Sequence, residues 1–148
     1  MRETILIVCV GNICRSPLGE ALWNHRAAAL GIESAARSAG LSARLGDPMH
    51  PTSLRLLQES GINPEREHLA RPLRPAMLKE AELVLVMENW QRTALEKSAP
   101  FSRGRIFTLG HWQNVEIPDP MGEADEAFRL AFQLIDQGVS EWLRRAYT

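Results

Sequence analysis

A cysteine and an arginine near the start of the chain have the spacing of a phosphate-binding catalytic loop. Five residues separate Cys9 from Arg15. A cysteine thiolate is a nucleophile, and the planar guanidinium of an arginine matches two phosphoryl oxygens at once. The apolar run 5–8 precedes the cysteine, and Pro17 follows the arginine where it suits the first turn of a helix. This order predicts a loop, between a strand and a helix, that places a nucleophile beside a bound phosphoryl group.

The residues inside this loop suit the binding of an anion. About six peptide units at the start of a helix can direct their N–H groups at one dianion. Gly11 allows a backbone conformation that bulkier residues resist, and Asn12 tolerates a positive φ and can hydrogen-bond the loop backbone. The Ser16 hydroxyl can hydrogen-bond the Cys9 thiolate and favour its charged form, and it can also cap the helix. Besides the nucleophile and the arginine, the predicted phosphate-binding loop comprises Val10, Gly11, Asn12, Ile13, Cys14 and Ser16.

An ordinary core cysteine followed by a turn is the alternative interpretation of this segment. A cysteine and an arginine at this spacing are by themselves a weak pattern. The segment 9–17 is more specific, because it combines the end of a strand, Gly-Asn, Arg-Ser-Pro and a helix start in one block. That combination favours the catalytic loop.

Asp119 is the candidate general acid. A thiol phosphatase needs a proton donor for the leaving oxygen, on a loop near the nucleophile. Asp119 lies between Pro118 and Pro120, after the last predicted strand. The same residue type also suits a cap for the helix that follows, and the spacing alone does not separate the two roles.

The composition places limits on the class of protein. A chain of 148 residues fits one domain over 1–148, and its formal net charge of −1 gives no reason to expect a nucleic-acid partner or membrane insertion. No apolar run approaches the roughly 20 residues of a membrane span, and the start does not have the pattern of a signal peptide. Both cysteines lie in the opening loop, which indicates a reducing compartment, and we expect a cytoplasmic location.

The apolar pattern predicts strands that alternate with helices. The expected strands cover 4–9, 32–38, 83–87 and 105–109, and the expected helices cover 16–30, 52–60, 76–80, 88–97 and 123–145, the last with a kink at Gly138. This order predicts an α/β fold: a four-stranded parallel sheet flanked by helices on both faces, with the phosphate-binding loop between the first strand and the first helix. Ligands of such sheets bind at the carboxyl ends of the strands.

These motifs resemble the low-molecular-weight protein tyrosine phosphatases over essentially the whole chain. The segment 9–17, together with Asp119-Pro120, carries the resemblance. Further similar segments are Ser38-Ala39-Gly40, His68-Leu69-Ala70-Arg71-Pro72 and Leu85-Val86-Met87-Glu88. Leu109-Gly110-His111-Trp112 and the later Ile117-Pro118-Asp119-Pro120 look most like the bacterial branch associated with exopolysaccharide and capsule synthesis.

The resemblance implies a protein-tyrosine-phosphatase that works through a cysteinyl-phosphate intermediate. Cys9 would be the nucleophile, Arg15 would bind the phosphoryl group, and Asp119 would be the general acid and then the base that activates water. No metal or cofactor is implied, since the loop N–H groups and the arginine supply the positive field. The implied partner is a phosphotyrosine protein, an autophosphorylated bacterial tyrosine kinase, and the chain is expected to be a monomer or a weak dimer.

Two further residues match supporting positions of the family. Cys14 matches a second family cysteine, and we hypothesise that it traps an oxidised Cys9 as a reversible disulfide; the alternative is that it simply lines the loop. His68 matches a histidine that ties the phosphate loop to its surroundings, a structural role rather than a catalytic one.

The chain departs from the family at the rim of the expected site. Met121-Gly122 stands where the family usually has an aromatic residue followed by a basic one, and His50 stands where an aspartate often precedes Pro51. His50 and Met121 are therefore the candidate residues of the substrate rim. The departures concern ligand preference rather than the chemistry.

Three other functions remain as alternatives. An arsenate reductase on the same scaffold needs a further cysteine pair downstream, and this chain has no cysteine after Cys14. A protein-arginine phosphatase tends to have threonine where Ile13 stands. A non-catalytic phosphopeptide-binding module would not need Cys9, Arg15 and Asp119 together.

Overall fold

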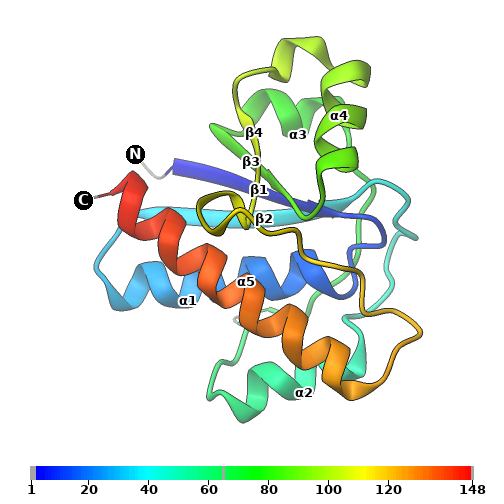
Figure 1. Ribbon diagram of the computed structural model, residues 1–148, viewed down its shortest axis with the longest axis vertical. Coiled ribbons are helices and arrows are strands. Elements are labelled where there is room, and N and C mark those ends of the chain that lie inside the picture. The colour runs from blue at the N-terminus through cyan, green and yellow to red at the C-terminus, as the bar shows by residue number, and fades with distance from the viewer. Residues whose placement is uncertain (1–2, 65, 148) are drawn as a thin grey trace.

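The computed structural model, which describes residues 3–64 and 66–147, contains a four-stranded parallel sheet. The strands are β1 (Glu3–Cys9), β2 (Ser34–Gly40), β3 (Leu83–Val86) and β4 (Ile106–Thr108). Their order across the sheet is β2-β1-β3-β4, and each neighbouring pair is parallel (Figure 1). The predicted four-stranded parallel sheet is confirmed, and β1 and β3 are its inner strands.

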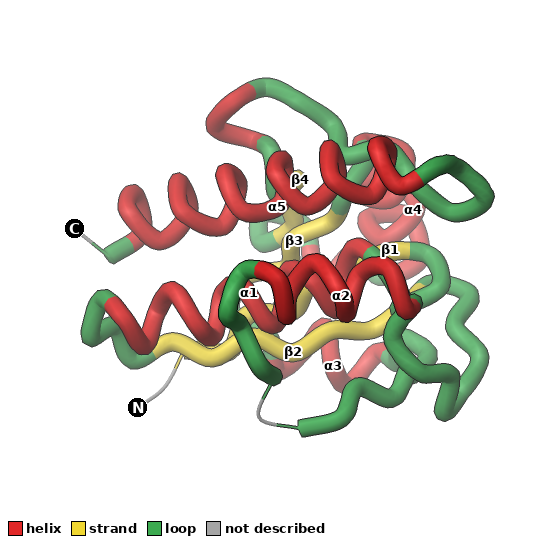
Figure 2. Tube along the Cα trace, turned by 90° about the horizontal axis from the view of Figure 1, so that it is seen from below, coloured by secondary structure: helices red, strands yellow, loops and turns green. Residues whose placement is uncertain are grey.

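Helices cover both faces of the sheet, as predicted. They are α1 (Arg15–Ala29), α2 (Pro51–Glu59), α3 (Pro75–Glu80), α4 (Asn89–Ser98) and α5 (Asp125–Ala146), with short 3₁₀ turns η1 (Pro100–Ser102) and η2 (His111–Gln113). Helices α1, α2 and α5 form one layer, seen from its own side in Figure 2, and α3 and α4 form the other. No helix in the described part of the chain combines the length and the apolar character that a membrane crossing requires.

The alternation of side chains along β1 divides the core in two. Ile5 and Ile7 point into the cluster formed with α1 and α5, whereas Leu6 and Val8 point into the cluster formed with α3 and α4. Because both faces are buried, the strand is apolar at successive positions, which is the pattern of an inner parallel strand.

Helix α1 begins earlier than expected and is not capped by Ser16. Its first residue is Arg15, Cys14 is the N-cap without a side-chain cap hydrogen bond, and Ser16 lies inside the first turn. The prediction of a Ser16 cap is therefore wrong, because that hydroxyl is used inside the site. At the other end Gly31 has a φ of 71° just after the helix, as its position suggested.

Two other elements differ in detail from the sequence prediction. Strand β2 begins and ends two residues later than 32–38, since its sequence is weakly apolar and pairing with β1 sets its limits. Helix α5 runs unbroken through Gly138. A Cβ at this glycine would lie 2.7 Å from the Leu109 carbonyl oxygen, so Gly138 permits close packing of α5 on the end of β4.

Candidate active site

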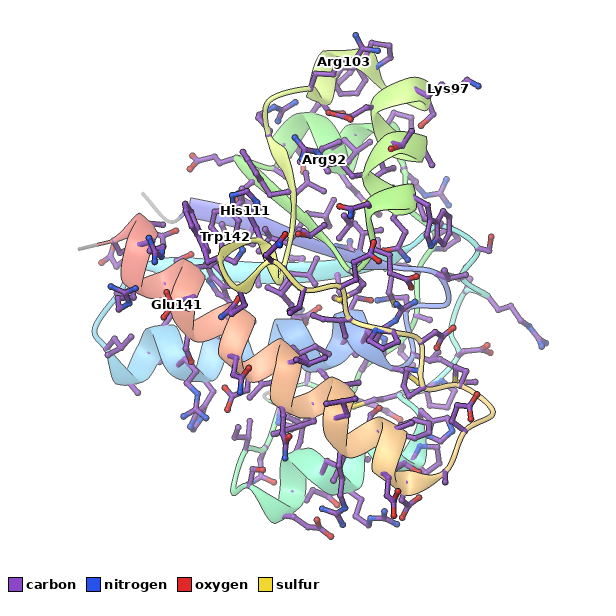
Figure 3. All side chains as sticks on the ribbon, in the orientation of Figure 1. Arg92, Lys97, Arg103, His111, Glu141 and Trp142 are labelled. Atoms are coloured by element: carbon purple, nitrogen blue, oxygen red, sulfur yellow. The ribbon has the colours of Figure 1, made fainter. Side chains whose placement is uncertain are left out.

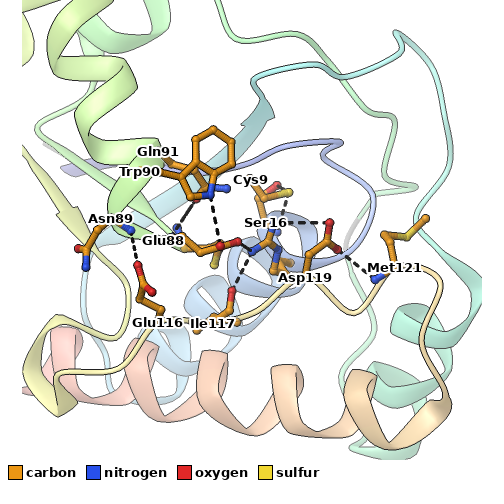
Figure 4. Close-up of polar contacts among 12 residues, drawn as sticks. Cys9, Ser16, Glu88, Asn89, Trp90, Gln91, Glu116, Ile117, Asp119 and Met121 are labelled. Carbon is orange, nitrogen blue, oxygen red and sulfur yellow. Dashed lines mark hydrogen bonds and ion pairs between the residues drawn. The ribbon is translucent and has the colours of Figure 1, made fainter.

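The candidate active site lies at the carboxyl edge of the sheet, where loops from three neighbouring strands meet. The loop 10–14 joins β1 to α1, Glu88 follows β3, and the segment 116–121 follows β4. Figure 4 shows Cys9, Ser16, Glu88 and Asp119 in one group although they come from distant parts of the chain. This is the edge at which ligands of parallel sheets bind.

The Cys9 sulfur is buried at the base of this group and receives several hydrogen bonds. The Ser16 hydroxyl oxygen lies 2.9 Å from Sγ, and the backbone N–H groups of Asn12 and Ser16 donate to it over 3.3 and 3.4 Å. The sulfur also lies close to the N-terminal end of α1, where the helix dipole is positive. The surroundings of Cys9 therefore suit a nucleophilic sulfur and not an inert core cysteine.

Asn12 fixes the shape of the loop. It is fully buried and has a φ of 56°, and its amide nitrogen donates to the hydroxyl oxygens of Ser16 (2.8 Å) and Ser38 (3.0 Å). Its amide oxygen accepts from the backbone N–H of Arg71 over 3.0 Å. The side chain thus bonds neighbouring segments rather than its own loop backbone. Because Asn12 already occupies the Ser16 oxygen as a donor, the Ser16 O–H is left to donate to Cys9.

The positive φ of the loop falls on Asn12 and not on Gly11. Gly11 is not among the glycines with a positive φ, and a Cβ there would meet only an ordinary contact with Ile13. The expectation that Gly11 supplies a conformation closed to other residues is therefore wrong. An asparagine with every amide group bonded takes that place instead.

His68 contacts the backbone of the phosphate-binding loop. Its Nε2 lies 2.6 Å from the carbonyl oxygen of Asn12, and since a carbonyl can only accept, the ring donates. The hydrogen bond agrees with the structural role expected for this histidine.

Arg15 is buried and held in place by carbonyl and carboxylate oxygens. Its side chain is 2% exposed, and Nη1 donates to Glu88 Oε1 over 2.5 Å and to the Ile117 carbonyl oxygen over 2.8 Å. Nη2 lies 3.9 Å from Asp119 Oδ2. A guanidinium bonded in this way is oriented before any ligand arrives.

The sequence prediction missed Glu88 as a residue of this site. A signal was available, because Glu88 follows a strand that is apolar on both faces, just as the catalytic loop follows the first strand. In a parallel sheet two such positions lie on the same edge.

Asp119 lies at the mouth of the site on an anchored loop. Its side chain is half-exposed, and Oδ1 accepts from the backbone N–H of Met121 over 3.0 Å. The loop is attached to the end of β3 by a hydrogen bond from the Ile117 N–H to the Met87 carbonyl oxygen, 3.0 Å. Ala124 is the N-cap of α5, so the alternative that Asp119 caps this helix is wrong.

Cys14 and Met121 form a sulfur contact at the rim. The Cys14 thiol is buried and lies 3.1 Å from the Met121 sulfur, whereas Met121 itself is 44% exposed. Burial raises the pKa of the Cys14 thiol to about 12. Both Cys9 and Cys14 are free thiols. Cys14 is thus protonated at neutral pH.

His50 lies beside the phosphate loop, but its ring is used by the fold. Its backbone N–H donates to the Ile13 carbonyl oxygen over 2.8 Å, and its Nδ1 accepts from the Thr52 N–H over 3.1 Å at the start of α2. The ring also packs on Phe128, with 4.6 Å between centroids. The structure thus brings His50 next to the phosphate-binding loop and uses its Nδ1 at the start of α2.

Protein groups are available to provide a positive field at this site. Among residues 3–64 and 66–147, no group of three or more His, Cys, Asp or Glu side chains is placed to hold a metal ion. The groups that can face an anion here are the N–H groups at the start of α1 and the Arg15 guanidinium.

Comparisons with known proteins agree with this site. The model of the low molecular weight phosphotyrosine protein phosphatase family matches residues 4–147. The chain is 37% identical over 142 residues to the low molecular weight protein-tyrosine-phosphatase Ptp of Acinetobacter johnsonii, covering 96% of each chain. It is 36% identical over 143 residues to Wzb of Escherichia coli K12, covering 96% of this chain and 94% of Wzb.

A solved structure of a related phosphatase is also similar to this chain over nearly its whole length. Wzb of Vibrio vulnificus, determined in complex with benzylphosphonate, superimposes with a TM-score of 0.89 at 34% identity, covering 98% of this chain and 99% of that one. The chain belongs to the low molecular weight phosphotyrosine protein phosphatase family and is a protein-tyrosine-phosphatase.

Proposed function

We propose that Cys9 is the nucleophile of this phosphatase, that Arg15 binds the phosphoryl group, and that Asp119 is the general acid. The observation that carries this assignment is the convergence of three hydrogen-bond donors on the Cys9 sulfur, at the start of the loop that ends at the oriented and buried Arg15. Val10, Gly11, Ile13 and Cys14 complete the loop between nucleophile and arginine.

The reaction then proceeds in two displacements at phosphorus. The Cys9 thiolate attacks phosphorus while Asp119 gives its proton to the departing tyrosyl oxygen, which leaves a cysteinyl-phosphate. Asp119, now a carboxylate, takes a proton from water as that water attacks phosphorus. Phosphate leaves, the thiolate of Cys9 is restored, and Arg15 and the loop N–H groups bear the phosphoryl charge throughout.

We further infer that the physiological substrate is an autophosphorylated bacterial tyrosine kinase of exopolysaccharide or capsule synthesis. The segments 109–112 and 117–120 and the similarity to the Wzb proteins support this choice. We place the reaction in the cytoplasm, where a catalytic thiol stays reduced.

The assignment is tested with a panel of phosphopeptides and a Cys9→Ser variant. We expect phosphotyrosine peptides to be hydrolysed far faster than matched phosphoserine or phosphoarginine peptides. Cys9→Ser should lose turnover because a serine hydroxyl stays protonated, and it should still bind inorganic phosphate, measured by calorimetry, because the loop donors remain. Retained turnover in this variant would exclude Cys9 as the nucleophile, and preferred hydrolysis of phosphoarginine would replace the tyrosine assignment.

A further inference from the structure

Trp90 is a large aromatic side chain that remains exposed at the mouth of the active site. It is the second residue of α4 and is 52% exposed. Its indole N–H donates to Glu88 Oε2 over 3.2 Å, and the other oxygen of the same carboxylate holds Arg15. In the view of Figure 4, Trp90 lies on one side of Cys9, and Asp119 and Met121 lie on the other.

Packing within the fold does not explain this tryptophan. Trp23 and Trp142 are buried in the core. Trp112 is partly exposed, but its ring packs edge-on against Trp142 with 5.3 Å between centroids, and Arg145 lies over it at 4.6 Å. Trp112 therefore belongs to a cluster near the C-terminal end of α5, which includes the His111 and Trp142 pair of Figure 3. Trp90 has no place in that cluster.

The indole is also oriented. Its N–H is bonded to a carboxylate that is itself bonded to a buried arginine, so the ring orientation is linked to the geometry of the phosphoryl site. A side chain whose orientation is fixed in advance loses less conformational freedom when a ligand contacts it. In the view of Figure 4, Cys9 lies between Trp90 and Met121, both of which are exposed, so an aryl group on a phosphate bound at Cys9 has room to extend between them.

We propose that Trp90 is the aromatic wall of the substrate pocket and contacts the phenyl ring of phosphotyrosine. The proposal rests on the active site assigned above and adds a residue that determines the preference for aryl esters. One aromatic contact of this kind strengthens binding about two- to tenfold. Trp90 does not touch the reacting atoms, so it should act on binding of the aryl group and leave the phosphoryl chemistry unchanged.

The test compares two ligands that share the phosphoryl site and differ in the ring. Dissociation constants of benzylphosphonate and of inorganic phosphate are measured by calorimetry for the parent protein, Trp90→Ala, Trp90→Phe and the matched control Trp112→Phe. We expect Trp90→Ala to weaken benzylphosphonate about two- to tenfold with phosphate unchanged. Trp90→Phe should keep most of the preference, because it keeps a ring, and Trp112→Phe should keep all of it. With a phosphotyrosine peptide, Trp90→Ala should raise KM and leave kcat in place.

Two results would overturn the proposal. Unchanged affinity for benzylphosphonate in Trp90→Ala would show that the ring does not contact Trp90. An equal loss of affinity for both ligands would show that Trp90 acts only through Glu88 and Arg15, as a support for the phosphate-binding loop. Failure of the active-site assignment would give a different result. Turnover would survive in Cys9→Ser, and this result does not depend on how the Trp90 variants bind the two ligands.

Discussion

The contacts of Arg15 show how two carboxylates can share one guanidinium unequally. Glu88 lies 2.5 Å from Nη1, whereas Asp119 lies 3.9 Å from Nη2. The closer carboxylate neutralises the buried cation and fixes its orientation. The more distant one is half-exposed and makes only a long contact with Arg15. At the scale of single residues, this geometry fits the proposed roles, in which Glu88 positions Arg15 and Asp119 transfers protons.

This division predicts the effect of removing the acid. Asp119→Asn keeps the size and the hydrogen-bond acceptor but cannot donate a proton to a phenolate. We expect cysteinyl-phosphate formation from a phosphotyrosine peptide to slow by roughly 10²–10⁴-fold, measured by single-turnover kinetics. An aryl phosphate with a much more acidic leaving group should show a smaller loss, because it needs less protonation. An equal rate with the phosphotyrosine peptide would mean that another residue is the acid.

The buried state of Cys14 bears on the hypothesis that it traps an oxidised Cys9. Peroxide would convert the Cys9 thiolate to a sulfenic acid, and the Cys14 thiolate would then attack that sulfur and expel hydroxide. The hydroxide takes up the proton that the Cys14 thiol released, so the products are the disulfide and water. Burial raises the pKa of Cys14 to about 12, so its thiolate is scarce at neutral pH. Closure of the disulfide should therefore be slow near pH 7.

The raised pKa of Cys14 predicts the pH dependence of that closure. The whole range from pH 7 to pH 9 lies below the Cys14 pKa of about 12. The thiolate fraction of Cys14, and with it the rate of disulfide closure, should therefore rise about tenfold per pH unit in this range. The rate is measured by thiol trapping and mass spectrometry after a pulse of peroxide. Recovery of activity on adding a thiol reductant should be larger in the parent than in Cys14→Ser, and equal recovery would contradict a protective disulfide.

At the scale of elements, the packing of α5 on the sheet depends on one glycine. A Cβ at Gly138 would lie 2.7 Å from the Leu109 carbonyl oxygen and 3.0 Å from its Cγ. The first of these atoms belongs to the backbone and cannot move aside without disturbing the end of β4. The same stretch of chain leads through η2 to the Asp119 loop.

Gly138→Ala should therefore destabilise the protein although alanine favours helices. Overpacking against backbone costs about 1–3 kcal/mol, and the gain in helix propensity is up to ~1 kcal/mol. We expect a net loss of up to about 3 kcal/mol in the free energy of unfolding, measured by urea denaturation. The neighbouring exposed residue offers a control, since Gln137→Ala should change stability by less than about 0.5 kcal/mol. An increase in stability for Gly138→Ala would contradict the close approach.

The sequence predicted the elements well where one local pattern determined them. The unbroken apolar runs at 4–9 and 83–87 became the inner strands, and the glycine after α1 ended that helix. The sequence prediction was wrong where a side chain had a competing hydrogen-bond partner in the folded loop. Ser16 has the residue type of a cap, but Cys9 and Asn12 take its hydroxyl, and this competition is set by the folded loop rather than by the local sequence.

At the scale of the whole molecule, the predicted parallel sheet was enough to bring the loops after the first and last strands to one edge. It did not give the strand order β2-β1-β3-β4. That order depends on pairing between segments far apart in the chain, which periodicity does not contain. It places the ends of β1 and β3 side by side, and this is why Glu88 contacts Arg15 and why Trp90 lies at the mouth of the site.

The place of each strand in the sheet also sets how readily two parts of the site can open: Cys9 at the end of β1, and the Asp119 loop after β4. β1 is paired along its length with β2 and over four residues with β3, so releasing Cys9 requires separation of the centre of the sheet. β4 is an edge strand of three residues with one neighbour. Local opening of a short edge element is far less costly than opening of a central one. We therefore expect the proposed nucleophile to lie in the part of the sheet that opens least readily, whereas the proposed acid follows a short edge strand that opens more readily.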